Sequence, residues 1–238
     1  MKLSFSSKDR ILIVAPHPDD EAIGCGGILA LYGNQCDVLI LTDGSKGKSN
    51  LRPSLCKDEL ISMRKKETQD AMKLAGVKKV QFLNIPDSEL ILHRNIVRQF
   101  DASVYDYIFI PNDGESHVDH LVANYIFRDM KLKKIIRAKL LGYEVWNPLS
   151  HVDAYLDISQ VEEKKKNMIS CYTSQLESAN YLEAAIGLNH YRALTYQGVN
   201  SVEAFEQIPC CILDILITYL KIIRKKILLL RLKLRVTF

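Results

Sequence analysis

Short apolar runs alternate with longer stretches of helical spacing through residues 11–145. Five runs end at Pro, Gly, Asp or Asn, a pattern typical of buried strands in a parallel sheet. The stretches between them space apolar residues as amphipathic helices do. The strand predictions cover residues 11–16, 37–42, 80–85, 107–111 and 139–145, and the helix predictions cover 21–32, 58–75 and 120–131.

Strand alternating with helix predicts an α/β fold, a Rossmann-like three-layer sandwich with a mainly parallel sheet and right-handed crossovers. In such a sheet the ligand crevice lies at the C-terminal edge of the strands. We expect one domain over residues 1–209. Within it, residues 161–172 have helical spacing, and residues 180–196 are predicted as a substrate-side loop or short strands.

The two strongest polar clusters follow the first and fourth predicted strands, so they should meet at that edge. The residues with zinc-binding side chains are His17, Asp20 and His120, with no cysteine beside them. Three His or carboxylate ligands are typical of catalytic zinc, whereas a structural site has four ligands, usually including Cys. Asp19 is then free to act as general base and acid, and His117 to stabilise an oxyanion, with Asp119 fixing its tautomer.

Each motif also has a simpler interpretation. The His-Pro-Asp-Asp tetrapeptide could be a turn that caps the next helix, and His117 with His120 could be capping or surface residues. Arg64 could be solvated on a helix face, and Asp87 could end a strand. The glycines of segment 24–27 match no phosphate-binding loop, so they predict close packing of a helix.

The motifs together resemble the PIG-L/LmbE family of zinc-dependent N-acetylglucosamine de-N-acetylases. The resemblance rests on Pro16 to Glu21 and His117 to His120, and it extends to Leu41–Gly47, to Arg64 with Glu67, and to Phe82–Leu90. One departure is Val118, where family members often have proline. The resemblance implies one Zn²⁺ per chain on His17, Asp20 and His120, a general base at Asp19, proton handling by His117 with Asp119, and substrate contacts from Arg64 and Asp87.

The resemblance further implies hydrolysis of an acetamide on a GlcNAc-type sugar, with release of acetate. We expect a glycoconjugate substrate, either a surface glycan or a lipid-linked intermediate. The alternative is a soluble thiol-cofactor precursor of the bacillithiol or mycothiol type. Two other classes stay open: a receiver-like regulator that holds magnesium at Asp19 and Asp20, and a non-catalytic sugar-binding protein. The receiver needs an acceptor aspartate at the end of the third strand and leaves the histidines unexplained.

Residues 210–238 form a second region with a different charge. They hold seven Lys or Arg and one Asp, a net charge of +6 in a chain of +4, so residues 1–209 carry −2. The basic pI is therefore no evidence for a nucleic-acid partner. An apolar stripe at steps of four and three predicts a basic amphipathic helix, which would pack on its own domain or a partner, or lie on an anionic membrane. The stripe consists of Leu216, Leu220, Ile223, Ile227, Leu230 and Leu234.

The six cysteines lack a regular spacing, and the polar N-terminus shows no secretory signal, so we expect a reducing compartment without disulfides. No apolar run reaches the length of about 18–20 residues that a spanning helix needs. The expected location is the cytoplasm, with peripheral membrane association through 210–238 as one option. The sequence leaves a homo-oligomer open.

Overall fold

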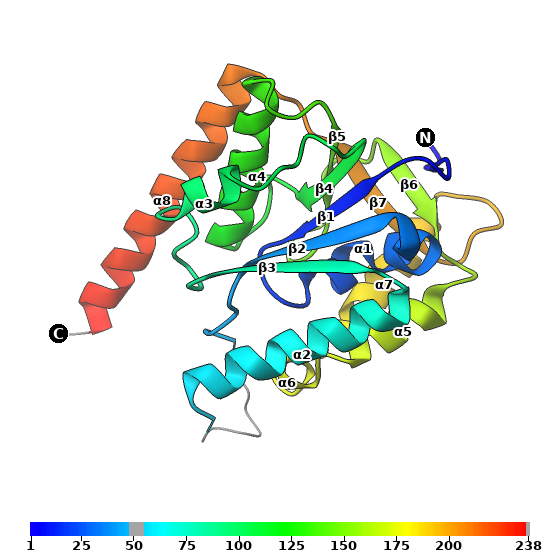
Figure 1. Ribbon diagram of the computed structural model, residues 1–238, viewed down its shortest axis with the longest axis horizontal. Helices are drawn as coiled ribbons and strands as arrows, with labels where there is room; N and C mark the ends of the chain where they lie inside the picture. The colour runs from blue at the N-terminus through cyan, green and yellow to red at the C-terminus, as the bar shows by residue number, and fades with distance from the viewer. Residues whose placement is uncertain (48–54, 237–238) are drawn as a thin grey trace.

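A seven-stranded sheet forms the centre of the molecule (Figure 1). The computed structural model describes residues 1–47 and 55–236, with side chains as far as residue 229 in the last helix. The strand order is β3-β2-β1-β4-β5-β7-β6; β1 to β5 are parallel and β7 is antiparallel to both neighbours. The strands are β1 (Ile11–Ala15), β2 (Cys36–Thr42), β3 (Lys79–Ile85), β4 (Tyr107–Pro111), β5 (Lys139–Tyr143), β6 (Ala154–Asp157) and β7 (Val202–Gln207).

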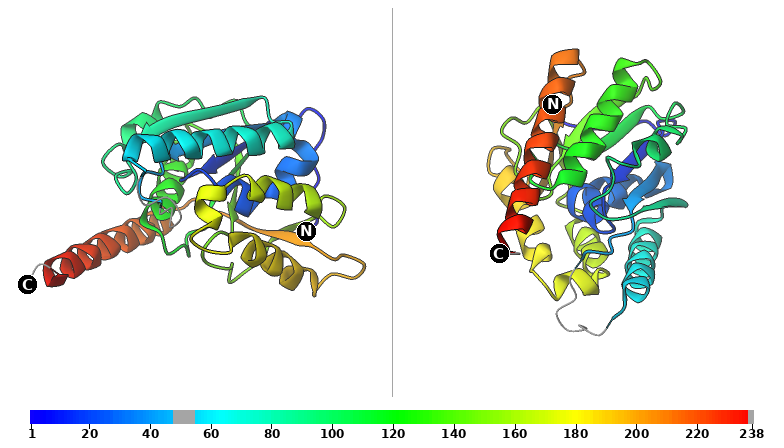
Figure 2. Two further views of the ribbon diagram at one scale, coloured as in Figure 1. Left: turned by 90° about the horizontal axis from the view of Figure 1, so that it is seen from below. Right: turned by 90° about the vertical axis from the view of Figure 1, so that its left-hand side faces the viewer.

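Helices cover both faces of the sheet, so the predicted three-layer fold class is confirmed (Figures 1 and 2). One face carries α1 (Asp20–Tyr32), α2 (Lys57–Ala75), α5 (Glu162–Ser170), α6 (Thr173–Leu176) and α7 (Tyr181–Ala193). The other face carries α3 (Arg94–Arg98), α4 (Val118–Leu132) and α8 (Ile212–Val236). A short 3₁₀ helix, Gly33–Gln35, joins α1 to β2.

The central strand β1 shows why its sequence is apolar throughout. All five of its residues are fully buried. Ile11, Ile13 and Ala15 pack into the core under α1, and Leu12 and Val14 pack into the core under α4. A strand covered on both faces has no position at which a polar side chain would reach water.

Helix α1 is interrupted at Cys25, whose φ of −131° and ψ of 19° are not helical. The backbone N–H groups of Gly27 and Ile28 donate to the Glu203 carboxylate, which also binds Lys165 at 2.7 Å in the core. A side chain at Gly27 would clash with Ile158 and Glu203, so the predicted close packing at these glycines is confirmed. This packing fixes α1, and therefore its first residue, Asp20.

Residues 147–209 differ most from the prediction. The segment predicted as a loop or short strands at 180–196 contains α7, and β6 and β7 were not predicted. The segment 161–172 contains α5 as expected. Helix α7 buries Ala185, Ile186, Asn189 and Ala193. This set mixes small, apolar and polar residues, so it gives no clear apolar stripe in the sequence.

The crevice at the sheet edge follows from the chain connections. Strands β1 and β4 are neighbours, yet the chain leaves β1 into α1 on one face and leaves β4 into α4 on the other. Such a reversal opens a crevice beyond the C-terminal ends of the two strands. The polar segments that begin at Pro16 and Asn112 both enter this crevice.

Helix α8 packs against α4 through Ile215, Thr218 and Ile222. Figures 1 and 2 show that its C-terminal part projects beyond the rest of the molecule. Among the described residues, no helix is long and apolar enough to cross a membrane.

Candidate active site

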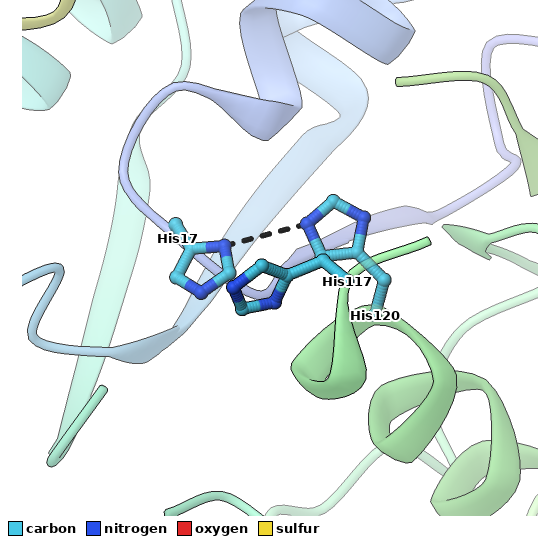
Figure 3. A group of neighbouring side chains, drawn as sticks. All are labelled: His17, His117 and His120. Carbon is cyan, nitrogen blue, oxygen red and sulfur yellow. Dashed lines mark hydrogen bonds between the residues drawn. The ribbon is translucent and has the colours of Figure 1, made fainter. Parts of the chain in front are cut away.

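Three side chains from the two polar segments that enter the crevice each bring one ligand-type atom to a common point. The Nδ1 atom of His17 lies 3.2 Å from Asp20 Oδ2 and 3.3 Å from His120 Nε2. His120 Nε2 lies 3.2 Å from the same Asp20 oxygen. His17 comes from the turn after β1, and His120 from the first turn of α4 (Figure 3). The structure therefore brings together the three residues predicted as metal ligands.

This triangle fits a tetrahedral metal ion. Zinc bonds to N and O ligands of about 2.0–2.2 Å place neighbouring ligand atoms about 3.3 Å apart. The three observed separations agree with that spacing. Burial opposes protonation of His120, but Asp20 and Glu115 raise its pKa to about 9. Two imidazoles and one carboxylate, all buried, form a donor set suited to zinc.

Other groupings of ligand-type atoms are also present. Those of His17, His117 and His120 lie within 4.8 Å of one another, as do those of His17, Asp87 and Asp119. The first grouping is a weaker candidate for a metal site. His117 Nδ1 accepts the backbone N–H of Asp119 at 3.2 Å, and the neutral ring then carries its proton on Nε2, so neither nitrogen has a free lone pair for a metal ion. The second uses the Nε2 face of His17, where the carboxylates lie 3.4 Å and 3.7 Å away. The tightest set of atoms is the triangle with Asp20.

Each ligand histidine has a carboxylate behind it. Asp119 Oδ2 lies 3.4 Å from His17 Nε2, and Glu115 Oε2 lies 3.3 Å from His120 Nδ1. Neither nitrogen has a well-aligned hydrogen-bond partner among the described residues. A carboxylate on the far nitrogen fixes the ring orientation and makes the metal-facing nitrogen more basic. His17 is therefore oriented to offer Nδ1 to a metal ion, and His120 is oriented to offer Nε2.

Glu115 is a site residue that the sequence analysis did not single out. It is buried and accepts the backbone N–H groups of Val145 at 3.0 Å and Trp146 at 3.2 Å. It thereby joins the loop after β5 to the back of His120. The available signal in the sequence was its position in the polar segment after the fourth strand, which does not distinguish it from its neighbours.

Asp19 is held in an unusual backbone conformation beside the triangle. Its φ is +136°, a value that costs a non-glycine residue about 1–3 kcal/mol. Arg64 donates to Asp19 Oδ2 at 3.1 Å and to the Pro18 carbonyl at 2.6 Å. Burial raises the pKa of Asp19 to about 7, with Arg64 acting in the opposite direction. The carboxyl group is thus placed and tuned for proton exchange near neutral pH.

Glu21 supports the backbone of Asp19 from the interior. It accepts the Asp19 N–H at 3.1 Å and contacts the Tyr172 hydroxyl. Burial raises the pKa of Glu21 to about 8. The Glu21 carboxyl group therefore restrains the peptide between Pro18 and Asp19.

His117 is the N-cap residue of α4. Because its Nδ1 accepts the Asp119 backbone N–H, the neutral ring carries its proton on Nε2. Burial and the charges of His17 and His120 lower its pKa to about 4. Asp119 thus orients His117 through its backbone N–H and not through its carboxylate. The Asp119 carboxylate instead faces His17 and accepts the Ser88 N–H at 2.7 Å.

Arg64 and Asp87 both lie at the site. Arg64 is 3% exposed and donates to the Gly44 carbonyl as well as to Asp19, so it is not a solvated helix-face residue. Asp87 accepts the Lys46 N–H at 3.2 Å and faces His17. Although burial opposes it, His17 lowers the pKa of Asp87 well below its ordinary value.

A cavity of about 640 Å³ opens in front of these residues. Both Asp19 and His117 line it, together with Arg64 and Asp87. Its remaining wall comes from Trp146, Gln175 and Ser178, which the sequence analysis did not assign to the site, and from Tyr181, in the segment 180–196 that was predicted to lie on the substrate side. The rings of Trp146 and Tyr181 meet edge to face at 5.4 Å.

Glu67 holds part of this wall in place. It accepts the Ser174 N–H at 2.8 Å and the hydroxyls of Thr173 and Ser174 at 3.0 Å and 2.7 Å. Helix α6 is thereby tied to α2, one turn after Arg64. The two residues of the Arg-x-x-Glu pattern therefore support different parts of the cavity. Arg64 contacts Asp19, and Glu67 holds α6 in the cavity wall.

A buried triangle of two histidines and one aspartate with a neighbouring carboxylate, on a parallel α/β sheet, is an arrangement that metal-dependent hydrolases use. Residues 12–131 match the PIG-L family, described as GlcNAc-PI de-N-acetylase, and the chain belongs to this family.

Two curated relatives extend the comparison. The chain is 33% identical over 132 residues to diacetylchitobiose deacetylase of Thermococcus kodakarensis, a match that covers 51% of this chain and 49% of that protein. It is 26% identical over 187 residues to a probable N-acetyl-alpha-D-glucosaminyl L-malate deacetylase 2 of Bacillus cereus, covering 71% and 84%. The match thus spans about half the length of the first relative and most of the second.

Solved structures share the fold. N,N'-diacetylchitobiose deacetylase from Pyrococcus horikoshii superposes with a TM-score of 0.70 at 23% identity, over 84% of each chain. The hydratase GalB from Pseudomonas putida reaches the same TM-score at 19% identity, over 86% and 98%. Because a deacetylase and a hydratase share this fold, the reaction has to be argued from the site.

Proposed function

We propose that this chain is a metal-dependent N-deacetylase that hydrolyses the acetamide of a GlcNAc-type sugar to acetate and a free amine. The observation that carries the proposal is the triangle of His17, Asp20 and His120, with Asp19 beside it on the wall of a 640 Å³ cavity. His17, Asp20 and His120 would hold one Zn²⁺ per chain. Bound there, zinc supplies the Lewis acidity that makes water a nucleophile at neutral pH.

The side chains around the triangle divide the remaining work. Asp19 takes the proton of the attacking water and passes it to the leaving nitrogen as the C–N bond breaks. Arg64 keeps the Asp19 carboxylate oriented through its 3.1 Å contact. The Nε2–H of His117 donates to the carbonyl oxygen as negative charge develops on it. One water is consumed, and acetate and an amine are formed.

The proposed substrate class follows from the cavity and the relatives. Asp87 can accept hydrogen bonds from sugar hydroxyls, and the aromatic side chains of Trp146 and Tyr181 offer apolar surface to a sugar ring. The Thermococcus and Bacillus relatives are named as deacetylases of diacetylchitobiose and GlcNAc-malate. We place a glycoconjugate first, either a surface glycan or a lipid-linked intermediate.

A soluble GlcNAc thiol-cofactor precursor is the second candidate. The observation that favours it is the Bacillus relative, whose length is matched over 84%. Both candidates carry a GlcNAc-type sugar, so Asp87, Trp146 and Tyr181 would contact either of them in the same way. The different aglycones therefore have to be compared directly.

The test is acetate release from a panel of GlcNAc conjugates, which includes diacetylchitobiose, GlcNAc-malate and a GlcNAc-lipid. Each is measured with purified protein, with metal-stripped protein and after zinc is restored, next to the Asp19→Asn variant. Zinc-dependent acetate release that Asp19→Asn abolishes supports the proposal. Sugar binding without acetate release would instead indicate a non-catalytic sugar-binding protein, and magnesium-dependent phosphorylation would indicate a receiver.

Three expectations are separate from the chemistry and remain proposals. These are the cytoplasmic location, a homo-oligomer, and the division of the chain into a deacetylase domain, 1–209, and an accessory helix, 210–238. Peripheral association with a membrane through 210–238 is a fourth, and it depends on α8 rather than on the site. Residues 237–238 of that segment lie outside the described residues.

A further inference from the structure

The apolar stripe of α8 faces solvent. We call the four side chains Leu216, Leu220, Ile223 and Ile227 the outer face of α8. They are 52%, 63%, 38% and 46% exposed. The two further members of the predicted stripe, Leu230 and Leu234, lie outside the described side chains. The helix packs on its own domain, as one alternative predicted, but through other residues than the stripe.

The opposite side of α8 fixes which residues point outward. Ile215, Thr218 and Ile222 are buried against the body of the molecule. Lys221 donates to the carbonyl of Asp113 at 3.0 Å, and Lys225 contacts the carbonyl of Ser116. These contacts hold α8 against the loop that leads into His117. The helix cannot roll to bury its outer face without breaking them.

The outer face is a hollowed apolar surface. Leu220, Ile223, Ile227 and Leu228, with Arg224, line a groove of about 470 Å³. The helix continues to Val236 and projects beyond the body in Figure 1 and in the left-hand view of Figure 2. Contiguous apolar surface of this kind on a globular protein marks an interaction site.

The charge of α8 identifies the kind of partner. Residues 210–238 contain seven basic residues and one acid, Asp214. Asp214 already faces Arg128 at 3.6 Å. Two copies of α8 packed through their outer faces would bring these cations together without compensating acids, which disfavours a second copy. An apolar stripe flanked by Lys and Arg matches the interface of an anionic lipid bilayer.

We propose that the outer face of α8 docks on an anionic lipid bilayer, with the helix lying in the plane of the interface. Leu220 and Ile227 enter the apolar boundary, and Arg224 and Lys226 reach lipid phosphates. Because Lys225 contacts the loop next to His117, the docked helix lies beside the candidate active site. The inference concerns where the protein works, and it does not depend on the deacetylase chemistry.

The test is sedimentation of the full-length protein with two kinds of vesicle. One kind is pure phosphatidylcholine, and the other also contains phosphatidylglycerol. We expect binding to the anionic vesicles alone, and binding that weakens as salt screens the charges. The double variant Leu220→Glu/Ile227→Glu should bind at least about tenfold more weakly, because it places two carboxylates in the docking surface. The matched control Leu92→Glu/Leu194→Glu changes two leucines that are 68% and 80% exposed elsewhere and should bind normally.

A second variant separates charge from apolar contact. Arg224→Gln/Lys226→Gln keeps the stripe but removes two cations, so it should reduce binding to anionic vesicles. Unchanged binding by either α8 variant, or no binding of the parent protein at low salt, would overturn the proposal. So would light scattering that shows a dimer which Leu220→Glu/Ile227→Glu converts to a monomer. Acetate release from a soluble substrate is measured in parallel, since its loss in all proteins would contradict the proposed function without affecting vesicle binding.

Discussion

The crevice and helix α8 both contact the segment 113–117, and they depart from the usual distribution of polar and apolar side chains in opposite ways. At the crevice, Asp20, Asp119 and His120 are buried. On α8, large apolar side chains are left in water. Buried charge is costly unless something compensates it, and exposed apolar surface is costly unless something covers it. The comparison supports the two proposals made above, that the crevice holds a cation and that the outer face of α8 contacts a lipid surface.

The largest effect on acetate release is expected when the triangle loses one of its three residues. His120→Ala removes a ligand, so we expect it to lose the metal and to reduce acetate release by a factor of about 1000 or more. Metal analysis of the purified variant, next to circular dichroism to verify folding, measures this. A folded His120→Ala protein with one zinc per chain would remove His120 from the ligand set.

The second largest effect is expected at Asp19, the proposed proton carrier. Asp19→Asn should keep the metal and reduce kcat by about 10²–10⁴-fold, because the amide cannot accept a proton. The control is its metal content, which should equal that of the parent protein. If Asp19→Asn turned over at the parent rate, the assignment of the general base would be wrong.

A third prediction contrasts the site with a buried charge pair that needs no outside partner. Lys165 and Glu203 lie 2.7 Å apart, 0% and 1% exposed. Lys165→Met leaves the Glu203 carboxylate without its partner and should lower the free energy of unfolding by about 3–5 kcal/mol. Denaturant unfolding measures it. The double variant Lys165→Met/Glu203→Gln should recover part of the loss, and a single variant as stable as the parent would contradict this account.

The smallest effect is expected on the outer face of α8. Leu220→Glu should change the free energy of unfolding by less than about 0.5 kcal/mol, since the side chain is already exposed. Ile222→Ala, two residues on and 1% exposed, should cost about 2–4 kcal/mol. If the two variants lowered the free energy of unfolding equally, the outer face would be covered in the purified protein. The contrast drawn here between the crevice and α8 would then be wrong.

Local patterns in the sequence were sufficient for the five parallel strands β1 to β5 and for the meeting of the three residues that we propose as metal ligands. Strand β1 is apolar throughout because both faces are covered, and His17 to Asp20 follow it directly. Once two strands are known to be parallel, their C-terminal segments must meet, which brings His120 to His17 without any knowledge of the side chains.

The parts that could not be predicted depend on contacts between distant residues. Glu115 matters because it lies behind His120 and accepts amides of the segment after β5. Asp119 was expected to orient His117, and its backbone N–H does contact that ring, but the first turn of α4 directs its carboxylate to His17. Periodicity located the stripe of α8 but could not reveal that the helix packs through Ile222 instead. Such pairings are set by tertiary packing and leave no local pattern.

At position 19, the residue that would best stabilise the fold differs from the residue that the proposed reaction needs. Glycine adopts a φ of +136° at little cost, so in an Arg64→Met background, which avoids an unpaired buried guanidinium, Asp19→Gly would relieve strain and remove a buried carboxyl group whose pKa is raised. The same substitution removes the group proposed to carry the proton. A screen for higher melting temperature would therefore select glycine at this position, and a screen for acetate release would select aspartate.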